Sequence, residues 1–394
     1  MKSATFKLGD ACEFIRGVTF DKAEATAKPE VGKVPILRAG NIGEELDAQN
    51  DLVWVPESRV ADKQCLRRND IAICMSSGSP EVVGKTARVP ANLRASVGSF
   101  CGIIRPRQAE QAGFLSFYFR SPAFAKQRDA IARGANIQNL RFSSFEEIEV
   151  EIPDEQQKIA RELEQADRLR RTRRYALELS DSFLPAAFLE LFGDPLEDRN
   201  GRTSTPLEDV TTQITDGEHA TPQRTPEGIK LLSARNIQNG FIDLSAGVDY
   251  VPESEFLRIR KRCWPRKGDV LMSCSGSIGR VATVPNDEPL SLVRSVALIR
   301  PNPDRVVSKY LEHYLRSRYA QAMISRSANQ SSQANIFTGP IKALPCLVPP
   351  MCKQRHFAAL VMQHERLRAT QREALRQAEH LFQNLLHQAF SEPS

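Results

Sequence analysis

Short apolar runs separated by turn-forming residues fill most of the first 150 positions and most of the region from about 205 to 350. Clear examples are residues 70–74, 100–104, 269–272 and 295–299. Gly, Pro, Asn and Ser lie between these runs, as is typical of β-strands joined by turns. In each region a single helical stretch is predicted after the strands, at 114–128 and at 310–325.

Two longer stretches have apolar residues three or four positions apart, which favours helices packed along a coiled-coil seam. The first runs from about Gln156 to Phe192 without glycine, and its one proline, Pro185, should end or kink it near its C-terminal end. The second runs from about Lys353 to Phe390. The predicted seam residues are Ile159, Leu163, Ala166, Leu169, Leu360, Leu367, Ala374, Ala378, Leu381 and Leu385. Ordinary burial in a helix bundle is the alternative interpretation of these stripes.

The same succession of short motifs occurs twice, with an offset that stays between 195 and 199 residues. The clearest pairs join 37–42 to 232–237, Val55–Ser58 to Val251–Ser254, Ile104–Pro106 to Ile299–Pro301, and Tyr118–Ser121 to Tyr314–Ser317. Chance does not give many matches in the same order at one offset. The chain is therefore predicted to contain a duplicated domain.

The predicted fold class is α+β, with two similar globular domains that are each followed by a long helix. Because each helix follows its own domain, the two helices most simply pair as an antiparallel coiled coil, which gives the chain pseudo-twofold symmetry. The predicted domains are 1–152 and 196–348, and the helical segments are 153–195, with a polar linker, and 349–394.

Composition agrees with a globular chain: 41% of the 394 residues are hydrophobic, 26% are charged, and the net charge is +6. That excess permits a polyanionic partner without requiring one. No apolar run is long enough to cross a membrane, and the N-terminus lacks the apolar region of a secretion signal. The eight cysteines show no CxxC pair, which favours free thiols and a cytoplasmic location.

The sequence does not match most of the known catalytic motifs. Five residues separate Gly78 from Gly84, whereas a phosphate-binding loop needs four, and the only Pro-Pro pair, Pro349–Pro350, lacks the polar and aromatic neighbours of an adenine methyltransferase motif. Asp154 and Glu155 open a helix, where carboxylates serve as caps. A pairing of Cys and His for nucleophilic catalysis stays open. The run 168–174 contains five arginines and is either a solvated helix face or a contact with phosphate or an acidic partner.

Two similar domains held by rigid helices suit DNA, because a duplicated protein can bind two half-sites at a fixed spacing. Turn residues able to contact bases or phosphates occur in both copies. The candidates are Arg16, Lys22, Arg38, Asn41, Ser77, Ser79, Lys85, Asn136, Gln138, Asp216, His219, Thr221, Arg235, Asn236, Ser275, Ser277, Arg280 and Gln333. The alternative for any one of them is a surface turn or a cap, and Ser-Gly-Ser can simply be a tight turn.

The chain resembles the specificity subunits of type I restriction–modification systems over nearly its full length. The resemblance rests on Phe192–Pro195, on 214–222 (ITDGEHATP), on 268–280 (GDVLMSCSGSIGR), and on the Ile-Pro and Val-Pro-Pro entries to the helices, followed by Gln157 and Gln354. The first copy departs from the pattern, with Asn69 in place of Gly268 and an expanded turn at 79–84. The copies are therefore expected to recognise different bases.

The resemblance implies a subunit without catalytic activity that recognises a bipartite, asymmetric site in double-stranded DNA. Two modification subunits, which methylate adenine at N6 with S-adenosylmethionine, and restriction subunits, which use ATP and Mg, are the implied partners, and the chain itself is expected to bind no cofactor or metal. A fused restriction or modification enzyme is disfavoured by the missing motifs. A coiled-coil scaffold or a DNA-binding protein without sequence readout remains the alternative.

Overall fold

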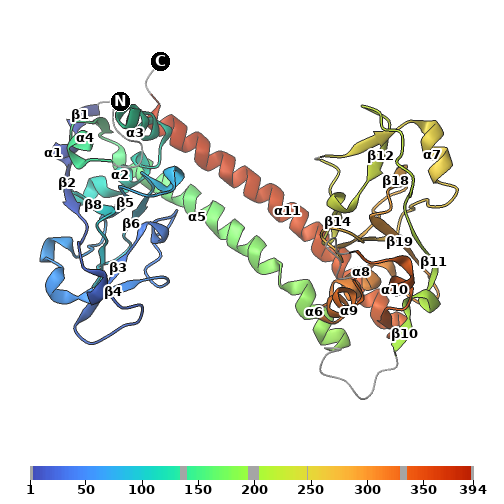
Figure 1. The fold of residues 1–394 in the computed structure, drawn as a ribbon. Coiled ribbons are helices and arrows are strands. Elements are labelled where there is room, and N and C mark those ends of the chain that lie inside the picture. The colour runs from blue at the N-terminus through green and yellow to red at the C-terminus, as the bar shows by residue number, and fades with distance from the viewer. Residues whose placement is uncertain (1–2, 134–139, 194–203, 246, 329–334, 392–394) are drawn as a thin grey trace. The chain divides into compact units, whose positions relative to one another are not determined.

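The computed structural model describes residues 3–133, 140–193, 204–245, 247–328 and 335–391 (Figure 1). The chain forms two compact units. Unit 1 comprises residues 1–174 together with 374–394, and unit 2 comprises residues 175–373. Unit 1 is therefore assembled from two segments of the chain that lie 200 positions apart in the sequence. The predicted bounds of the two domains and two helical segments stay a prediction.

Three small sheets form the β-structure of unit 1. Their strands are β1 (Ser3–Lys7), β2 (Cys12–Arg16), β3 (Lys33–Leu37), β4 (Val53–Pro56), β5 (Ile71–Cys74), β6 (Thr86–Arg88), β7 (Ser96–Val97), β8 (Cys101–Pro106) and β9 (Glu149–Pro153). The four-stranded sheet has the order β2-β8-β5-β6 and is antiparallel. In the second sheet, β4-β3-β7, strand β3 is antiparallel to β4 and parallel to β7, and β1 pairs with β9.

Unit 2 repeats this arrangement. Its strands are β10 (Ser204–Pro206), β11 (Thr211–Asp216), β12 (Ile229–Leu232), β13 (Ile237–Gln238), β14 (Phe241–Ile242), β15 (Asp249–Val251), β16 (Val270–Ser273), β17 (Val281–Thr283), β18 (Leu290–Leu292), β19 (Val296–Pro301) and β20 (Pro345–Leu347). The sheets β11-β19-β16-β17, β15-β12-β18 and β10-β20 match the three of unit 1 in order and direction. The hairpin β13-β14 is an addition.

The continuous apolar runs are explained by cores on both faces of the central strands. Successive side chains of a strand point to opposite faces. Ile71 and Ile73 pack into one core of unit 1, while Ala72 packs into another. Val270 and Leu271 are divided in the same way between two cores of unit 2.

The helices surround these cores. They are α1 (Leu8–Ala11), α2 (Ala112–Tyr118), α3 (Pro122–Arg133), α4 (Phe142–Glu146), α5 (Gln156–Ser180), α6 (Phe183–Phe192), α7 (Glu253–Ile259), α8 (Ser308–Arg316), α9 (Arg318–Ser327), α10 (Thr338–Lys342) and α11 (Met351–Phe390). No helix among the described residues is both long enough and apolar enough to cross a membrane.

The prediction of one helical stretch per copy is wrong, because each copy has two helices there. The serine that ends the repeated Tyr-x-Arg-Ser motif caps the second helix. Ser121 Oγ accepts a hydrogen bond from the Phe124 amide at 3.2 Å, and Ser317 Oγ accepts one from the Ala320 amide at 3.3 Å. Such caps satisfy amides at the start of a helix.

The first long helix is interrupted, as its proline predicted. Helix α5 ends at Ser180 and α6 begins at Phe183, so that Pro185 lies in the first turn of α6. A proline in this turn leaves no hydrogen bond unmade, because the first amides of a helix have no partner within it. The second long helix runs without a break through Phe390.

The long helices pack antiparallel within each unit, but the predicted seam is partly wrong. In unit 1, Leu163 and Ala166 of α5 pack against Phe382 and Leu386 of α11, while the predicted Leu381 is 46% exposed. Leu169 and Leu367 are 40% and 56% exposed. A shift of one position along a helix turns its buried stripe by about 100°. The aromatic Phe382 takes the inward position, and the guanidinium of Arg170 lies 4.4 Å from its ring centroid.

Each unit contains the same buried polar contact at the equivalent position, as well as equivalent strands. Arg105 donates to both carboxylate oxygens of Asp70, at 2.8 and 2.7 Å, and Arg300 does the same to Asp269, at 2.9 and 2.7 Å. Both carboxylates are almost fully buried. The next residue back, Asn69 in unit 1 and Gly268 in unit 2, has a φ of 76° and 87°. Asn tolerates this region better than most residues, which explains the exchange. The structure therefore supports duplication at the level of individual contacts.

Candidate nucleic-acid interface

The loops that carry most of the candidate residues leave the four-stranded sheet of each unit at the same end of its strands, which is called the loop edge below. In unit 2, Asp216 at the end of β11 and Met272 near the end of β16 both pair with Ala297 of β19. In unit 1, Arg16 and Ile73 both pair with Gly102. The loops after β2 and β5, and after β11 and β16, therefore start side by side.

The loops after β3 and β12 reach the same edge. The amide of Ala234 donates to Ser295 Oγ at 3.1 Å, and the amide of Glu218 donates to the Leu292 carbonyl at 2.8 Å. Gly217 allows this close approach, because a Cβ there would lie 2.4 Å from the Leu292 backbone. Gly17 has the same role, since a Cβ would lie 2.1 Å from the Gly98 carbonyl oxygen.

A charged cluster forms the loop after β11. The Asp216 carboxylate lies 2.7 Å from His219 Nε2 and accepts a hydrogen bond from Arg262 at 2.6 Å. Glu218 accepts one from Arg258 at 3.1 Å. About half of the side chains of His219 and Arg262 is exposed. This loop thus presents an imidazole and a guanidinium to solvent on a fixed carboxylate.

The remaining candidates of unit 2 lie on neighbouring turns. Arg280 donates to Gln238 Oε1 at 3.0 Å, and Arg235 donates to Asp249 at 3.0 Å. Ser277 is exposed and Ser275 is half-buried, on a turn in which Gly276 has a φ of 67°. Thr221 is exposed.

In unit 1 the candidate side chains are more separate. Arg16, Lys22, Ser79 and Lys85 are exposed, and Ser77 Oγ accepts a hydrogen bond from the Ser79 amide at 3.1 Å. These side chains flank the edge at which β2 and β5 end.

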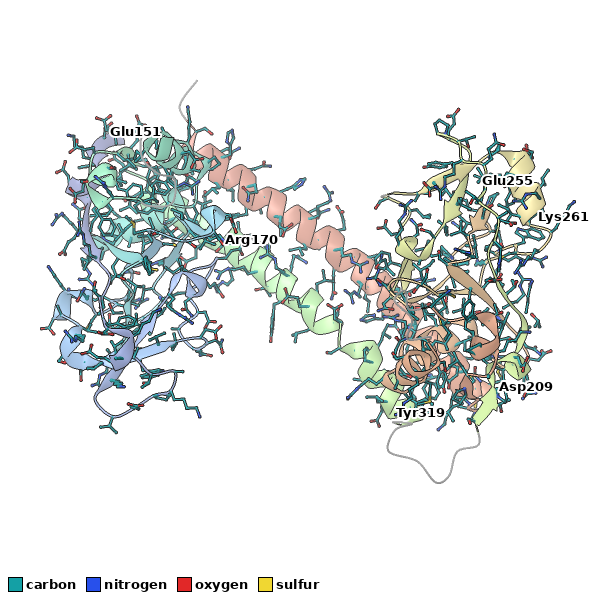
Figure 2. All side chains as sticks on the ribbon, viewed as in Figure 1. Glu151, Arg170, Asp209, Glu255, Lys261 and Tyr319 are labelled. Carbon is teal, nitrogen blue, oxygen red and sulfur yellow. The ribbon has the colours of Figure 1, made fainter. Side chains whose placement is uncertain are left out.

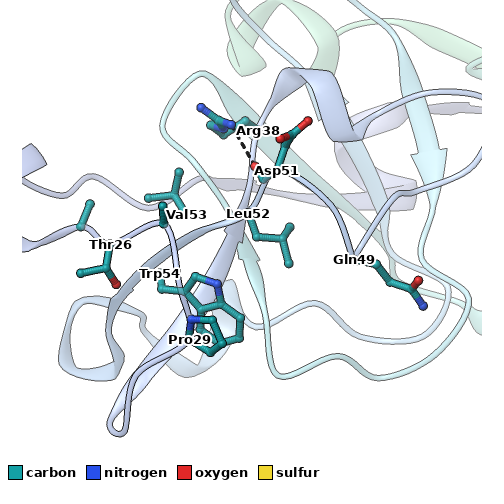
Figure 3. A pocket seen from close by; sticks show the side chains of 10 residues that line it. Thr26, Pro29, Arg38, Gln49, Asp51, Leu52, Val53 and Trp54 are labelled. Carbon is teal, nitrogen blue, oxygen red and sulfur yellow. Dashed lines mark hydrogen bonds between the residues drawn. The ribbon is translucent and has the colours of Figure 1, made fainter.

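Beside this edge lies an open hollow of about 560 Å³ (Figure 3). Its lining includes Thr26, Arg38, Gln49, Asp51 and Trp54. Arg38 donates to the carbonyl of Asp51 at 2.9 Å, which fixes its guanidinium at the rim. The hollow therefore combines an indole face with a fixed cation and an amide.

Asn41 and Asn236, both among the predicted DNA contacts, are buried residues of tight turns. They are 4% and 1% exposed. Asn41 Oδ1 accepts from the Arg38 amide at 2.8 Å, and its Nδ2 donates to the Asn50 carbonyl. Asn236 Oδ1 accepts from the Ser233 amide at 2.9 Å in the same way. Each side chain fixes a tight turn and has no free edge for a base.

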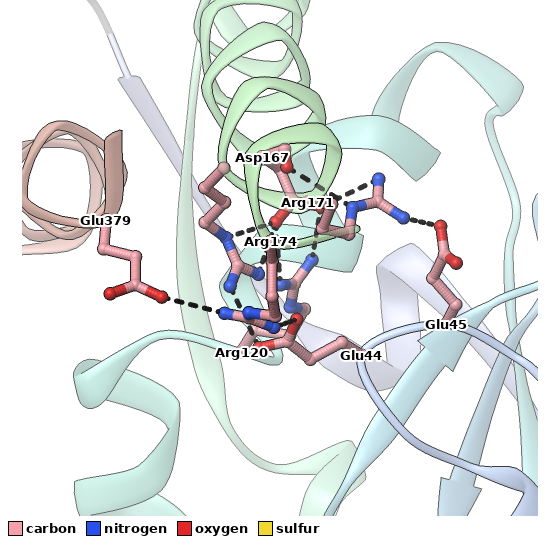
Figure 4. A network of polar contacts seen from close by, with 8 residues as sticks. Glu44, Glu45, Arg120, Asp167, Arg171, Arg174 and Glu379 are labelled. Carbon is pink, nitrogen blue, oxygen red and sulfur yellow. Dashed lines mark hydrogen bonds and ion pairs between the residues drawn. The ribbon is translucent and has the colours of Figure 1, made fainter. Parts of the chain in front are cut away.

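The arginine run of α5 also has a structural function in three of its five members (Figure 4). Arg170 donates to Asp167 and Glu44, each at 2.9 Å, and Arg171 pairs with Asp167 and Glu45. Arg174 bridges Glu44 and Glu379, at 2.9 and 3.0 Å. Burial raises the pKa of Glu44, but hydrogen bonds from Arg170 and Arg174 outweigh it and leave this pKa below its ordinary value. These arginines hold a loop of the globular domain to α5, and Arg168 and Arg173 stay exposed.

Asn136, Gln138 and Gln333 lie outside the described residues. Within the described residues, no group of three His, Cys, Asp or Glu side chains is arranged to hold a metal ion.

Burial raises the pKa of the Cys263 and Cys346 thiols to about 12, so these thiols stay protonated.

Two residues beside the candidate interface, Trp54 and Arg262, were not among the contacts predicted from the sequence. Trp54 immediately precedes the first Val-Pro-Glu-Ser motif, and Tyr250 precedes the second, so an aromatic residue recurs at this place. The backbone carbonyl of each accepts a hydrogen bond from a threonine amide, that of Thr26 at 2.9 Å and that of Thr225 at 3.0 Å. Arg262 belongs to a basic run, 258–267, that the sequence displays openly.

The chain is similar to known DNA-specificity subunits in sequence and in fold. Residues 2–179 match the family model described as type I restriction modification DNA specificity domain. The chain is 27% identical to the EcoKI specificity subunit of Escherichia coli K12, over 95% of this chain and 86% of that one, and 36% identical to the StySPI specificity subunit of Salmonella potsdam over 41% and 35%. The type I S subunit structure from M. genitalium has the same fold, with a TM-score of 0.61 at 16% identity, covering 100% and 97%.

Proposed function

Because residues 2–179 match the type I restriction modification DNA specificity domain and the chain is similar to the EcoKI specificity subunit over most of its length, we propose that it belongs to this family and is the DNA-reading, non-catalytic subunit of such a system. Each unit reads one half of a split, asymmetric target. The proposal rests on one observation. The two units have the same sheets and the same buried contacts, but different polar side chains on the loops at the end of the four-stranded sheet. A scaffold has no need for two different sets of exposed loop residues.

The loop chemistry of unit 2 suits direct reading of bases. A guanidinium such as that of Arg262 or Arg280 pairs with guanine, and a carboxylate such as Asp216 accepts from cytosine. Hydroxyl groups of Thr221, Ser275 and Ser277 suit phosphates. In unit 1, the reading residues are Arg16, Lys22, Arg38, Ser77, Ser79 and Lys85, so the two halves of the target differ in sequence.

The partners are double-stranded DNA, two modification subunits and restriction subunits that act as translocases. Apolar side chains that stay exposed on the long helices provide docking surfaces for the modification subunits. In unit 1 these are Leu169 and Leu381, and in unit 2 they include Tyr175, Leu179 and Leu367. The S-adenosylmethionine, ATP and Mg of the reaction belong to these partners.

The test is co-expression of the chain with an adenine methyltransferase (modification) subunit from the same genome, followed by sequencing of methylated adenines. We expect one split motif with a fixed gap and different halves. The methyltransferase expressed alone is the control and should leave no such motif. Absence of methylation, with a chain that binds DNA regardless of sequence, would favour the scaffold or non-specific alternative.

A further inference from the structure

A strongly basic segment, residues 258–267, begins in the last turn of α7 and continues into the loop that leads to β16 of unit 2. It contains six basic residues and no acidic one: Arg258, Arg260, Lys261, Arg262, Arg266 and Lys267. Figure 2 shows Lys261 on the loop that follows α7, at the outer edge of this unit. The segment belongs to none of the predicted recognition loops, so its charge needs an explanation of its own.

Two of the six cations are held by carboxylates. Arg258 pairs with Glu255 and Glu218, and Arg262 pairs with Asp216. For Arg260, Lys261, Arg266 and Lys267, no carboxylate within ion-pair distance is found among the described residues. Four unpaired positive charges within eight positions repel one another, and an anionic partner relieves that repulsion.

Trp264 fixes two of the unpaired guanidinium groups. Arg260 and Arg266 lie 4.1 and 4.2 Å from its ring centroid, within cation–π distance. Stacking uses the flat face of a guanidinium and leaves its N–H edge free to donate to phosphate oxygens. An arginine that is already ordered loses less entropy on binding than a freely moving one.

The backbone of the segment is also anchored. Arg300 donates to the Trp264 carbonyl at 2.8 Å, and the Arg266 amide donates to Asp269 at 2.9 Å. The Lys267 amide donates to Asp287 at 3.0 Å, and Cys263 is fully buried. The cations therefore stand on a rigid base rather than on a freely moving loop.

The segment lies directly beside the candidate interface. Gln213 of β11 donates to the Arg262 carbonyl at 3.3 Å, and the Arg262 side chain contacts Asp216 at the start of the recognition loop. DNA read by that loop would continue past the basic segment. Phosphate contacts fix register and supply affinity without reading sequence.

We propose that Arg260, Lys261, Arg266 and Lys267 form a phosphate-binding surface that holds duplex DNA beside the half-target read by unit 2. This assignment rests on the proposed function and extends it, because it separates anchoring from reading within one unit. The surface binds any sequence, and its contribution falls as salt rises.

The test measures binding of the full chain, purified with its co-expressed methyltransferase, to a random-sequence duplex at several salt concentrations. Lys261→Gln/Lys267→Gln removes two exposed charges. The slope of log K against log salt is negative, and each lost phosphate contact reduces its magnitude by about 1, so we expect the slope to become less steep by about 2. Lys261→Arg/Lys267→Arg should restore the wild-type slope.

The matched control is Lys353→Gln/Arg355→Gln, which removes the same charge from exposed positions on α11 and should leave the slope unchanged. An unchanged slope in the first variant overturns the proposal. So does loss of methyltransferase assembly with normal DNA binding, because the segment would then contact an acidic protein. Failure of the proposed function looks different: the wild-type complex would show no preference for its methylated motif over random duplex.

Discussion

In unit 1 the buried carboxylate next to the long helix belongs to the helix, whereas in unit 2 it belongs to the globular domain. Asp167 of α5 accepts hydrogen bonds from Arg120 and Arg170. Glu312 of α8 accepts from Arg316, Lys309 and Thr283, and Lys309 in turn donates to Glu365 of α11 at 2.9 Å. Arg120 and Arg316 occupy the same place in the repeated Tyr-x-Arg-Ser motif. One conserved element of the duplication thus serves two different ways of attaching a domain to a helix.

The loops that follow Asn41 and Asn236 also differ in whether ion pairs attach them to a long helix. The loop that follows Asn41 is tied to α5 through Glu44 and Glu45. The loop that follows Asn236 folds instead into the hairpin β13-β14, and no ion pair joins its described residues to α11. Duplication thus preserved the sheets and turn caps, while the attachment of each domain to its helix and the exposed side chains of the loops diverged.

Removal of either buried carboxylate should give the largest effect. Asp167→Asn takes from Arg120 the carboxylate partner that it has among the described residues and leaves Arg170 with Glu44 alone, and breaking a buried ion pair costs about 3–5 kcal/mol. We expect faster amide exchange confined to unit 1, and Glu312→Gln should give the same result confined to unit 2. Glu162→Gln, an exposed position on α5, is the control and should change stability by less than about 0.5 kcal/mol. Exchange that rises equally in both units after either change would contradict the separate attachments.

His313 should make unit 2 more sensitive to acid than unit 1. Burial, together with the charges of Arg316 and Lys309, lowers the pKa of His313 to about 3. The unfolded chain binds a proton below about pH 6.5 and the folded one does not, so stability is lost as pH falls from 6.5 towards 3. This difference reaches about 2 kcal/mol at pH 5.

Unit 1 has Phe117 at the equivalent position, which supplies the test. His313→Phe should remove this part of the pH dependence of unit 2, as measured by thermal unfolding between pH 5 and pH 7.5. An unaltered pH dependence would show that other groups are responsible.

The loop attachment of unit 1 should have a smaller effect. Glu44→Gln/Glu45→Gln removes partly exposed ion pairs, each of which contributes about 1 kcal/mol or less. Amide exchange should accelerate at 42–52 and stay unchanged at 237–245. No local acceleration would mean that the hydrogen bonds of Asn41 hold the loop without the arginines.

The smallest change in stability is expected at the predicted seam residues that proved exposed. Leu367→Gln should change stability by less than about 0.5 kcal/mol, whereas Phe382→Ala should cost about 3–5 kcal/mol. Leu367→Gln should nevertheless reduce recovery of the methyltransferase with the chain. A large loss of stability in Leu367→Gln would restore the predicted seam.

The strands, the duplication and the two long helices were predictable because each depends on local pattern. The seam register was not, since Phe382 is held inward by Arg170, which lies more than 200 positions away in the sequence. The arginine run was ambiguous for the same reason: its partners Glu44 and Glu379 are brought to it by the fold. Asn41 and Asn236 carry a further lesson. A residue repeated in both copies belongs to the common frame, and residues that differ between copies are better candidates for recognition.

Methylated-adenine sequencing of two single variants tests whether each unit reads one half of the target. His219→Ala changes the loop edge of unit 2, and Arg16→Ala changes that of unit 1. Each variant is co-expressed with the methyltransferase. We predict that each relaxes a different half of the split motif and leaves the gap and the other half unchanged. Relaxation of the same half by both variants, or of both halves by either one, would contradict the assignment of one half-target to each unit.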